Sequence, residues 1–145
     1  MSKNPFITED ERDRIIRAIE SAELKTSGEI RIHLESYCKG DPVERAVLIF
    51  NRLEMHKTEQ RNGVLIYVAL KSRKLSIIGD SGINSVVPAN FWSEVKDILK
   101  MYISRGELSD GLISAVALSG DKLGEFFPYK KDDVNEQSNE ISFGK

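Results

Sequence analysis

Two short stretches of the sequence are rich in the oxygen ligands that bind divalent cations. The stretch DSGIN offers the Asp80 carboxylate and the Asn84 carboxamide on either side of a turn-forming glycine. The stretch DDVNE near the end of the chain offers four more such side chains, those of Asp132, Asp133, Asn135 and Glu136. Calcium takes about 6–8 oxygen ligands from carboxylates, carboxamides, carbonyls and water, and flexible loops supply them well. The two stretches together predict a divalent-metal site, with calcium as the first choice and magnesium as the alternative.

Other interpretations of these stretches stay open. Neither has the spacing of an EF-hand loop, which is longer and closes with a glutamate. Acidic loops are also often simply solvated, because exposed carboxylates gain little from their neighbours. Zinc is a weaker choice, since His33 falls in an alternating stretch and His56 at the end of a helical one, without the spacing of a ligand pair.

The first half of the chain predicts a helix, a strand and a second helix. Thr8 and Glu11 form a capping box before a helix that ends at the TSG of residues 26–28. Apolar and polar residues then alternate over 29–35, which is typical of a strand with one exposed face. Asp41 is a helix cap before Pro42, and the helix that follows extends to Leu53.

The second half predicts a hairpin, two helices and a last strand. The unbroken apolar run GVLIYVAL over 63–70 favours a central strand that is covered on both faces. KSRK is a turn into a second strand, LSIIGD, and residues 79–90 are expected to be a loop. Helices are predicted over 91–105, where Gly106 ends the first, and from about Leu112 to before Pro128. Residues 139–143 could add a short strand.

This order of elements predicts a single α/β domain over residues 1–145, a three-layer α/β/α sandwich with a mixed sheet of about four strands. The first two strands are joined by a crossover helix and should be parallel, whereas the hairpin makes the third antiparallel to the second.

The topology predicts which residues share a rim of the sheet. Glu29, the loop 55–62 and Asp80 should lie on one rim, and the last helix returns the chain to it. The C-terminal tail, residues 129–145, is therefore expected to pack on this rim and to place its acidic stretch beside Asp80 and Asn84. Glu29 and Glu59 are weaker candidate ligands there. The opposite rim should collect the remaining polar residues, which are Glu35, Cys38, Asp41, Lys71, Glu107 and Asp110.

Composition narrows the possible partners. The 21 Lys and Arg against 23 Asp and Glu give a net charge of -2, which lacks the basic excess expected for nucleic acid or an acidic membrane surface. Cys38 is the single cysteine, so an internal disulfide is excluded. The N-terminal residues do not have the apolar run of a signal peptide, and we expect a cytoplasmic protein.

Four stretches of the sequence resemble the TPM domain family: TSGEIRIHLES, RNGVLIYVALKSRKLSIIGDSGI, RGELSDGLISAV and FPYKKDDVNEQSNEISFGK. The resemblance is to the stand-alone bacterial form and implies an α/β/α sandwich. It also implies acid phosphatase activity in some members and divalent-metal binding in others. The family's Gly-Glu-Ile strand start matches Gly28, Glu29 and Ile30, and its strand-ending glycine matches Gly79. Many relatives continue with an aromatic residue and a second glycine, where this chain has Asp80 and Ser81.

Two functions follow from these observations. The first is a binding module for calcium or magnesium whose loops are ordered by the metal, in a regulatory or interaction role. The alternative is a metal-dependent acid phosphatase acting on phosphomonoesters, in which Lys or Arg holds the phosphate near a metal-bound hydroxide. The sequence has no C-x5-R, D-x-D or G-x-S-x-G nucleophile motif, so we favour the binding module and assign no catalytic residue. Metal ions and an unidentified protein are the expected partners of a monomer.

Overall fold

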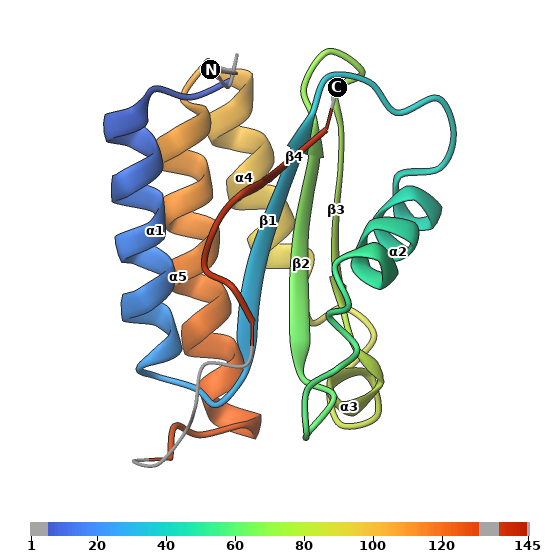
Figure 1. Ribbon diagram of the computed structural model, residues 1–145, viewed down its shortest axis with the longest axis vertical. Helices are drawn as coiled ribbons and strands as arrows, with labels where there is room; N and C mark the ends of the chain where they lie inside the picture. The colour runs from blue at the N-terminus through green and yellow to red at the C-terminus, as the bar shows by residue number, and fades with distance from the viewer. Residues whose placement is uncertain (1–5, 131–136, 145) are drawn as a thin grey trace.

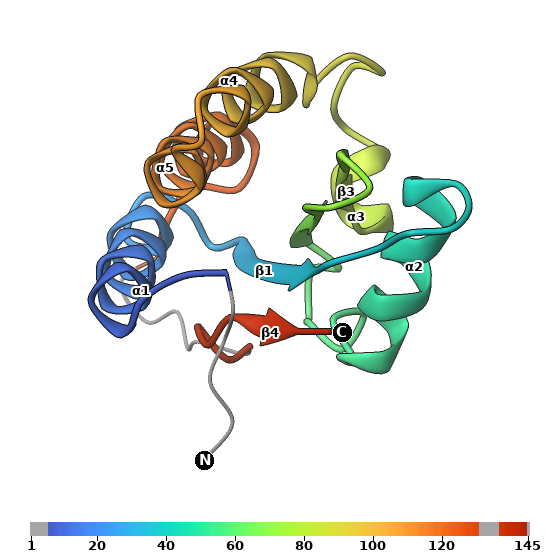
Figure 2. The ribbon, with the colours of Figure 1, turned by 90° about the horizontal axis from the view of Figure 1, so that it is seen from above.

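The computed structural model describes residues 6–130 and 137–144, and it is a three-layer α/β/α sandwich (Figure 1). The acidic stretch DDVNE, with Asp132, Asp133, Asn135 and Glu136, lies outside the described residues. Seen from above, helices cover both faces of the sheet (Figure 2). The predicted fold class is confirmed.

The central sheet is mixed and has the strand order β3-β2-β1-β4. β1 (Glu29–Glu35) pairs in parallel with β2 (Gly63–Ala69), with Glu29 opposite Gly63. β3 (Lys74–Gly79) is antiparallel to β2, as the hairpin predicted. The two-residue strand β4 (Ser142–Phe143) pairs in parallel with β1 at the other edge. β3 and β4 are therefore the edge strands.

The helices form two layers around this sheet. One layer contains α1 (Glu9–Glu23), α4 (Ser93–Ser104) and α5 (Leu108–Phe126), which pack side by side. The other consists of α2 (Pro42–Arg52), which packs on β3 and β2. A single turn, α3 (Ser81–Asn84), follows β3. None of these helices combines the length and the apolar composition that crossing a bilayer requires, within the part of the chain that is described.

Two hydrophobic cores hold the layers together, and β2 contributes to both. Its residues Val64, Ile66 and Val68 face the three-helix layer, whereas the intervening residues face α2. Successive side chains of a strand point to opposite faces. An unbroken apolar run is therefore what a strand covered on both faces requires, and this prediction is confirmed.

Three local predictions were wrong. The polar face of β1 is not exposed, because Arg45 of α2 and Ser142 of β4 cover its His33 and Glu35. Residues 79–90 are not all loop, since the Asp80 side chain accepts a hydrogen bond from the Ser81 N–H and starts α3. The last helix begins at Leu108 rather than near Leu112.

Candidate functional site

One rim of the sheet, the tail rim, is formed by the first residues of β1 and β2 and the end of β3. The pairing of Glu29 with Gly63, and the hydrogen bond from the Asp80 N–H to the Gly63 carbonyl, place both predicted carboxylates on this rim. They are two strands apart, however. With neighbouring strands roughly 4.8 Å apart, this corresponds to about 10 Å between their backbones. The tail rim therefore has two separate acidic positions.

The first position is a pair of carboxylates at the start of β1. Glu29 is 4% exposed, and Glu23 comes from the last turn of α1 with a side chain that accepts a hydrogen bond from the Ile30 N–H at 2.9 Å. Burial raises the pKa of Glu23, the Ile30 hydrogen bond opposes this effect, and the negative charges of Glu29 and Glu20 add to it; together they give a pKa of about 8. At neutral pH, Glu23 therefore holds a proton that an added cation could replace.

Both described ends of the tail are attached close to this pair. Thr26, three residues before Glu29, forms a β-bridge with Pro128, and its hydroxyl donates to the Phe127 carbonyl. On the far side of the gap, the Gln137 N–H donates to Glu29 Oε1 at 2.8 Å. The four predicted tail ligands lie in sequence between these two attachments.

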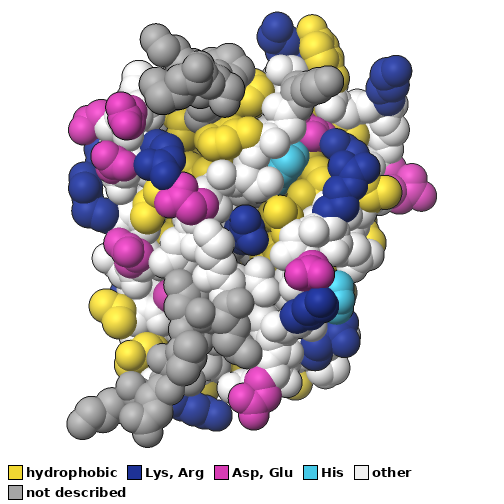
Figure 3. All heavy atoms as spheres, in the orientation of Figure 1, with side chains coloured by type: hydrophobic (Ala, Val, Ile, Leu, Met, Phe, Trp, Pro, Cys, Tyr) yellow, Lys and Arg dark blue, Asp and Glu magenta, His cyan; other side chains and the backbone are white. Residues whose placement is uncertain are grey.

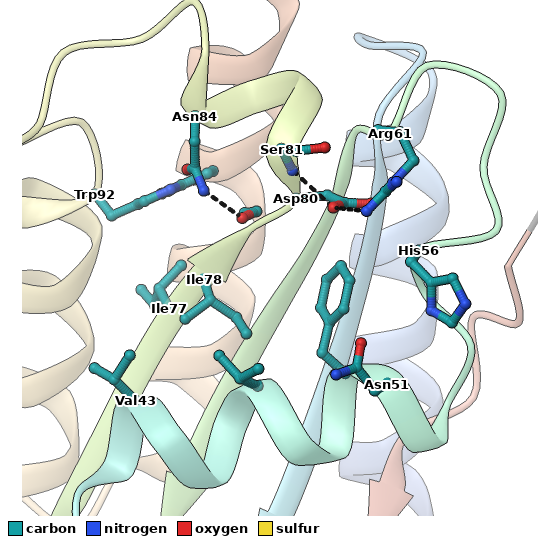
Figure 4. Close-up of a pocket in the computed structure, with 13 residues that line it drawn as sticks. Val43, Asn51, His56, Arg61, Ile77, Ile78, Asp80, Ser81, Asn84 and Trp92 are labelled. Atoms are coloured by element: carbon teal, nitrogen blue, oxygen red, sulfur yellow. Dashed lines mark hydrogen bonds and ion pairs between the residues drawn. The ribbon is translucent and has the colours of Figure 1, made fainter.

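The second position is Asp80, whose carboxylate already has partners. Arg61 donates to it through Nε at 2.8 Å and Nη2 at 2.9 Å, and the Ser81 N–H donates at 2.7 Å. Arg61 has a left-handed backbone with φ 51°, and its carbonyl accepts a hydrogen bond from the Gly82 N–H. A Cβ at Gly82 would collide with the carbonyls of Gln60 and Arg61, so this close approach requires glycine. Asp80 is thus held by a bidentate ion pair (Figure 4).

The remaining predicted ligands are arranged differently. The Asn84 amide donates to the Gly79 carbonyl at 2.9 Å, which uses the side chain to cap the end of β3. Glu59 is exposed in the loop before β2. Among the described residues, no three His, Cys, Asp or Glu side chains are close enough to hold a metal ion together. A site on this rim would therefore need ligands from residues 131–136.

The opposite rim contains a buried charge cluster that sequence reasoning missed. Glu35 is 1% exposed and accepts two hydrogen bonds from Arg45, one from the Tyr67 hydroxyl and one from His33. Burial alone would raise the pKa of Glu35, but these donors outweigh it and lower the pKa to about 2. Ten residues of sequence separate Glu35 from Arg45, and only the crossover from β1 into α2 brings them together.

His33 connects this cluster to the end of the chain. Its Nε2 lies 3.1 Å from Glu35 and its Nδ1 lies 2.8 Å from the Ser142 hydroxyl of β4. Burial lowers the pKa of His33, so the neutral ring that donates to Glu35 and accepts from Ser142 is favoured near pH 7. A Cβ at Gly144 would lie 2.5 Å from Glu35 Oε1, so the chain end passes directly over the cluster.

A groove of about 420 Å³ runs between α2 and β3. Val43 and Val47 of α2 form one wall, Ile78 of β3 the other, and Trp92 closes one side (Figure 4). The Arg61 and Asp80 pair stands at its polar end. Over the face shown in Figure 3, acidic and basic side chains are interspersed among apolar ones rather than gathered by sign.

Comparison with known proteins identifies one family and two similar solved structures. The model of the TPM domain family matches residues 3–122. The NMR structure of the BA42 protein from the psychrophilic bacterium Bizionia argentinensis is 42% identical in sequence, with a TM-score of 0.91 over 99% of this chain and 100% of that one. The N-terminal domain of cg2496 from Corynebacterium glutamicum is 12% identical, with a TM-score of 0.63 over 96% and 80%. The similarity to the cg2496 domain shows a shared fold and nothing more. No curated protein matches at the same level of significance.

Proposed function

The chain belongs to the TPM domain family, and from this premise we propose that it is a divalent-cation binding module. Calcium is the preferred ion, magnesium is the alternative, and the ion orders the acidic tail on the tail rim. Its role is regulatory or in interaction with a protein partner.

One observation carries the proposal: the buried carboxylate of Glu29 and the proton-holding Glu23 lie where the tail returns to the fold at Gln137. Burial, with a smaller effect of the Glu29 charge, keeps a proton on Glu23, and a cation bound between the two carboxyl groups would replace that proton and offset their repulsion. Calcium accepts such oxygens together with those of a flexible loop. Asp132, Asp133, Asn135 and Glu136 would complete the set.

Asp80 has a different role in this proposal. To bind the ion, its carboxylate would have to give up both Arg61 hydrogen bonds, and Arg61 cannot lose its charge to make this easier. We therefore assign Asp80 and Asn84 to the structure of α3 and the end of β3, and we place the ion at Glu23 and Glu29.

A calcium titration followed by amide NMR and by thermal unfolding tests this assignment. The wild-type protein should be stabilised by about 2.7 kcal/mol when free calcium is a hundredfold above the dissociation constant. The shift should disappear in Glu29→Gln and in the double variant Asp132→Asn with Asp133→Asn. It should persist in Asp80→Asn and in Glu44→Gln, which removes an exposed carboxylate from α2 as a charge control. Equal shifts in all five proteins would contradict the proposal.

The alternative, a metal-dependent phosphatase, is tested with the same proteins. Turnover of p-nitrophenyl phosphate that requires calcium or magnesium and is lost in Glu29→Gln would show that the protein is a metal-dependent phosphatase. We expect no such turnover, because the sequence has no nucleophile motif.

A further inference from the structure

We infer that the free edge of β3 is a docking site for an acidic, extended peptide segment of a partner protein, which adds a fifth strand to the sheet beside the α2 groove. This inference does not depend on the metal site, because β3 and the Glu29 end of β1 are separated by β2.

The hydrogen-bond register shows which backbone groups of β3 point outward. The Asp80 N–H donates to the Gly63 carbonyl, so residues 80 and 63 form a hydrogen-bonded pair of the antiparallel ladder. In such a ladder every second residue faces the partner strand. Residues 74, 76 and 78 therefore face β2, whereas Leu75, Ile77 and Gly79 turn their N–H and carbonyl groups to the open edge.

A side-chain contact supports this assignment. The Asn84 amide donates to the Gly79 carbonyl, which is possible only if that carbonyl points away from β2. Within residues 6–130 and 137–144, no backbone partner is found for the outward groups of Leu75 and Ile77. Unpaired groups with this two-residue repeat match an extended chain, which is how peptides add to sheet edges.

The groove beside the edge suits the side chains of an added strand. Val43 and Val47 of α2 are 48% and 45% exposed, although both line the groove opposite Ile78. Side chains of a strand next to β3 that point to the α2 face would lie against these valines. Among the residues that line the groove, the buried atoms Trp92 Nε1 and His56 Nδ1 have no hydrogen-bond partner within the described part of the chain. A bound polar group could satisfy them after a small rearrangement.

The charges at the two ends of the edge select an acidic partner. The hairpin end carries Lys71, Arg73 and Lys74, and at the other end Arg61 forms an ion pair with Asp80. Arg61 uses Nε and Nη2 for Asp80, and its side chain is 50% exposed. This local excess of positive charge contrasts with the net charge of -2 of the chain. Opposite charges at the ends of a bound strand would fix its position.

The test uses a fluorescent acetylated heptapeptide of alternating valine and threonine with glutamate at both ends. Binding is measured by fluorescence anisotropy and located by amide NMR. The amides of Leu75 and Ile77, which should exchange rapidly with solvent in the free protein, should become protected when the peptide binds. The same peptide with lysine at both ends should bind at least tenfold more weakly.

Two protein variants make the test specific to the groove. Val47→Glu places a carboxylate in the groove and should weaken binding of the acidic peptide at least tenfold. Leu48→Glu is the matched control, because Leu48 is equally exposed on α2 but does not line the groove, and it should bind as the wild type does. Thermal unfolding of both variants checks that they are folded.

The inference would be overturned if the acidic peptide did not bind at a concentration of about 1 mM. It would also be overturned if Val47→Glu and Leu48→Glu weakened peptide binding equally. The third contrary result is peptide-dependent protection of amides that lie away from β3. Sedimentation distinguishes the other occupant of such an edge. A concentration-dependent dimer in which Leu75 and Ile77 are protected without peptide would show that the edge pairs with a second copy instead.

Discussion

Glu29 and Glu35 are the first and last residues of the same strand, and both are buried, yet their surroundings are opposite. Glu35 receives four hydrogen bonds from Arg45, Tyr67 and His33. Glu29 instead lies beside a second carboxyl group, that of Glu23. A buried charge is stable only when its partners are built in or arrive from outside. The Glu35 end has four donors to one carboxylate, whereas at the Glu29 end the Gln137 N–H donates to Glu29 and a second carboxyl group, that of Glu23, lies nearby.

The largest loss of stability should come from removing the charge of Glu35. Glu35→Gln keeps the shape of the side chain but leaves Arg45 without its carboxylate, and breaking a buried ion pair from one side costs about 4 kcal/mol. Glu29→Gln should change the free energy of unfolding without calcium by less than about 1 kcal/mol, because it also relieves repulsion with Glu23. Urea unfolding of both variants measures the difference. Similar losses would remove the contrast between the two ends.

Of the two ends of β1, only the Glu35 end should lose stability as the pH falls below 4.5. The pKa of Glu35 is lowered from 4.5 to about 2, so the folded state holds this proton less tightly than the unfolded chain. The contribution of the Glu35 carboxylate to the free energy of unfolding is about 3 kcal/mol. It is complete above pH 4.5 and is lost as the pH falls toward 2. The measurement is urea unfolding between pH 2 and 5, compared with Glu35→Gln, in which this part of the acid dependence should be missing.

The Glu23 side should show the opposite slope at higher pH. Its pKa is raised from 4.5 to about 8, so the folded state binds the proton more tightly, and stability should fall as the pH rises from 4.5 to 8. The full difference corresponds to at most about 5 kcal/mol, and we expect about 2 because the side chain is partly exposed. Saturating calcium should flatten this slope, since the ion replaces the proton. A slope that calcium leaves unchanged would separate Glu23 from the metal site.

The smallest loss of stability should come from removing one of the hydrogen-bond donors to Glu35. Tyr67→Phe removes the hydroxyl that donates to Glu35 and keeps the ring in its core, and Arg45 and His33 still hold the carboxylate. We expect a loss of about 1 kcal/mol in the free energy of unfolding, as for a typical hydrogen bond. Tyr37→Phe, at an exposed ring, is the control and should have no measurable effect.

The layers and the rims could be predicted from the sequence because they depend on periodicity. The apolar run of β2 and the crossover and hairpin connections were enough to place Glu29 and Asp80 on one rim. The partners of the buried charges could not be predicted in the same way. Arg61 reaches Asp80 from a left-handed residue of an irregular loop, and Glu23 meets Glu29 across a helix end. Alternation along β1 predicts an exposed face, because the pattern shows which residues are polar but not that Arg45 and Ser142 cover them.

The position of β4 has a consequence for synthesis on the ribosome. The outer edge of β1 pairs with Ser142 and Phe143, and Ser142 is translated 109 residues after its hydrogen-bond partner His33. Domains begin to fold during elongation. While the intervening residues are made, the outer edge of β1 therefore stays open and His33 lacks Ser142, so a chaperone that binds the nascent chain would meet an unpaired β1 edge.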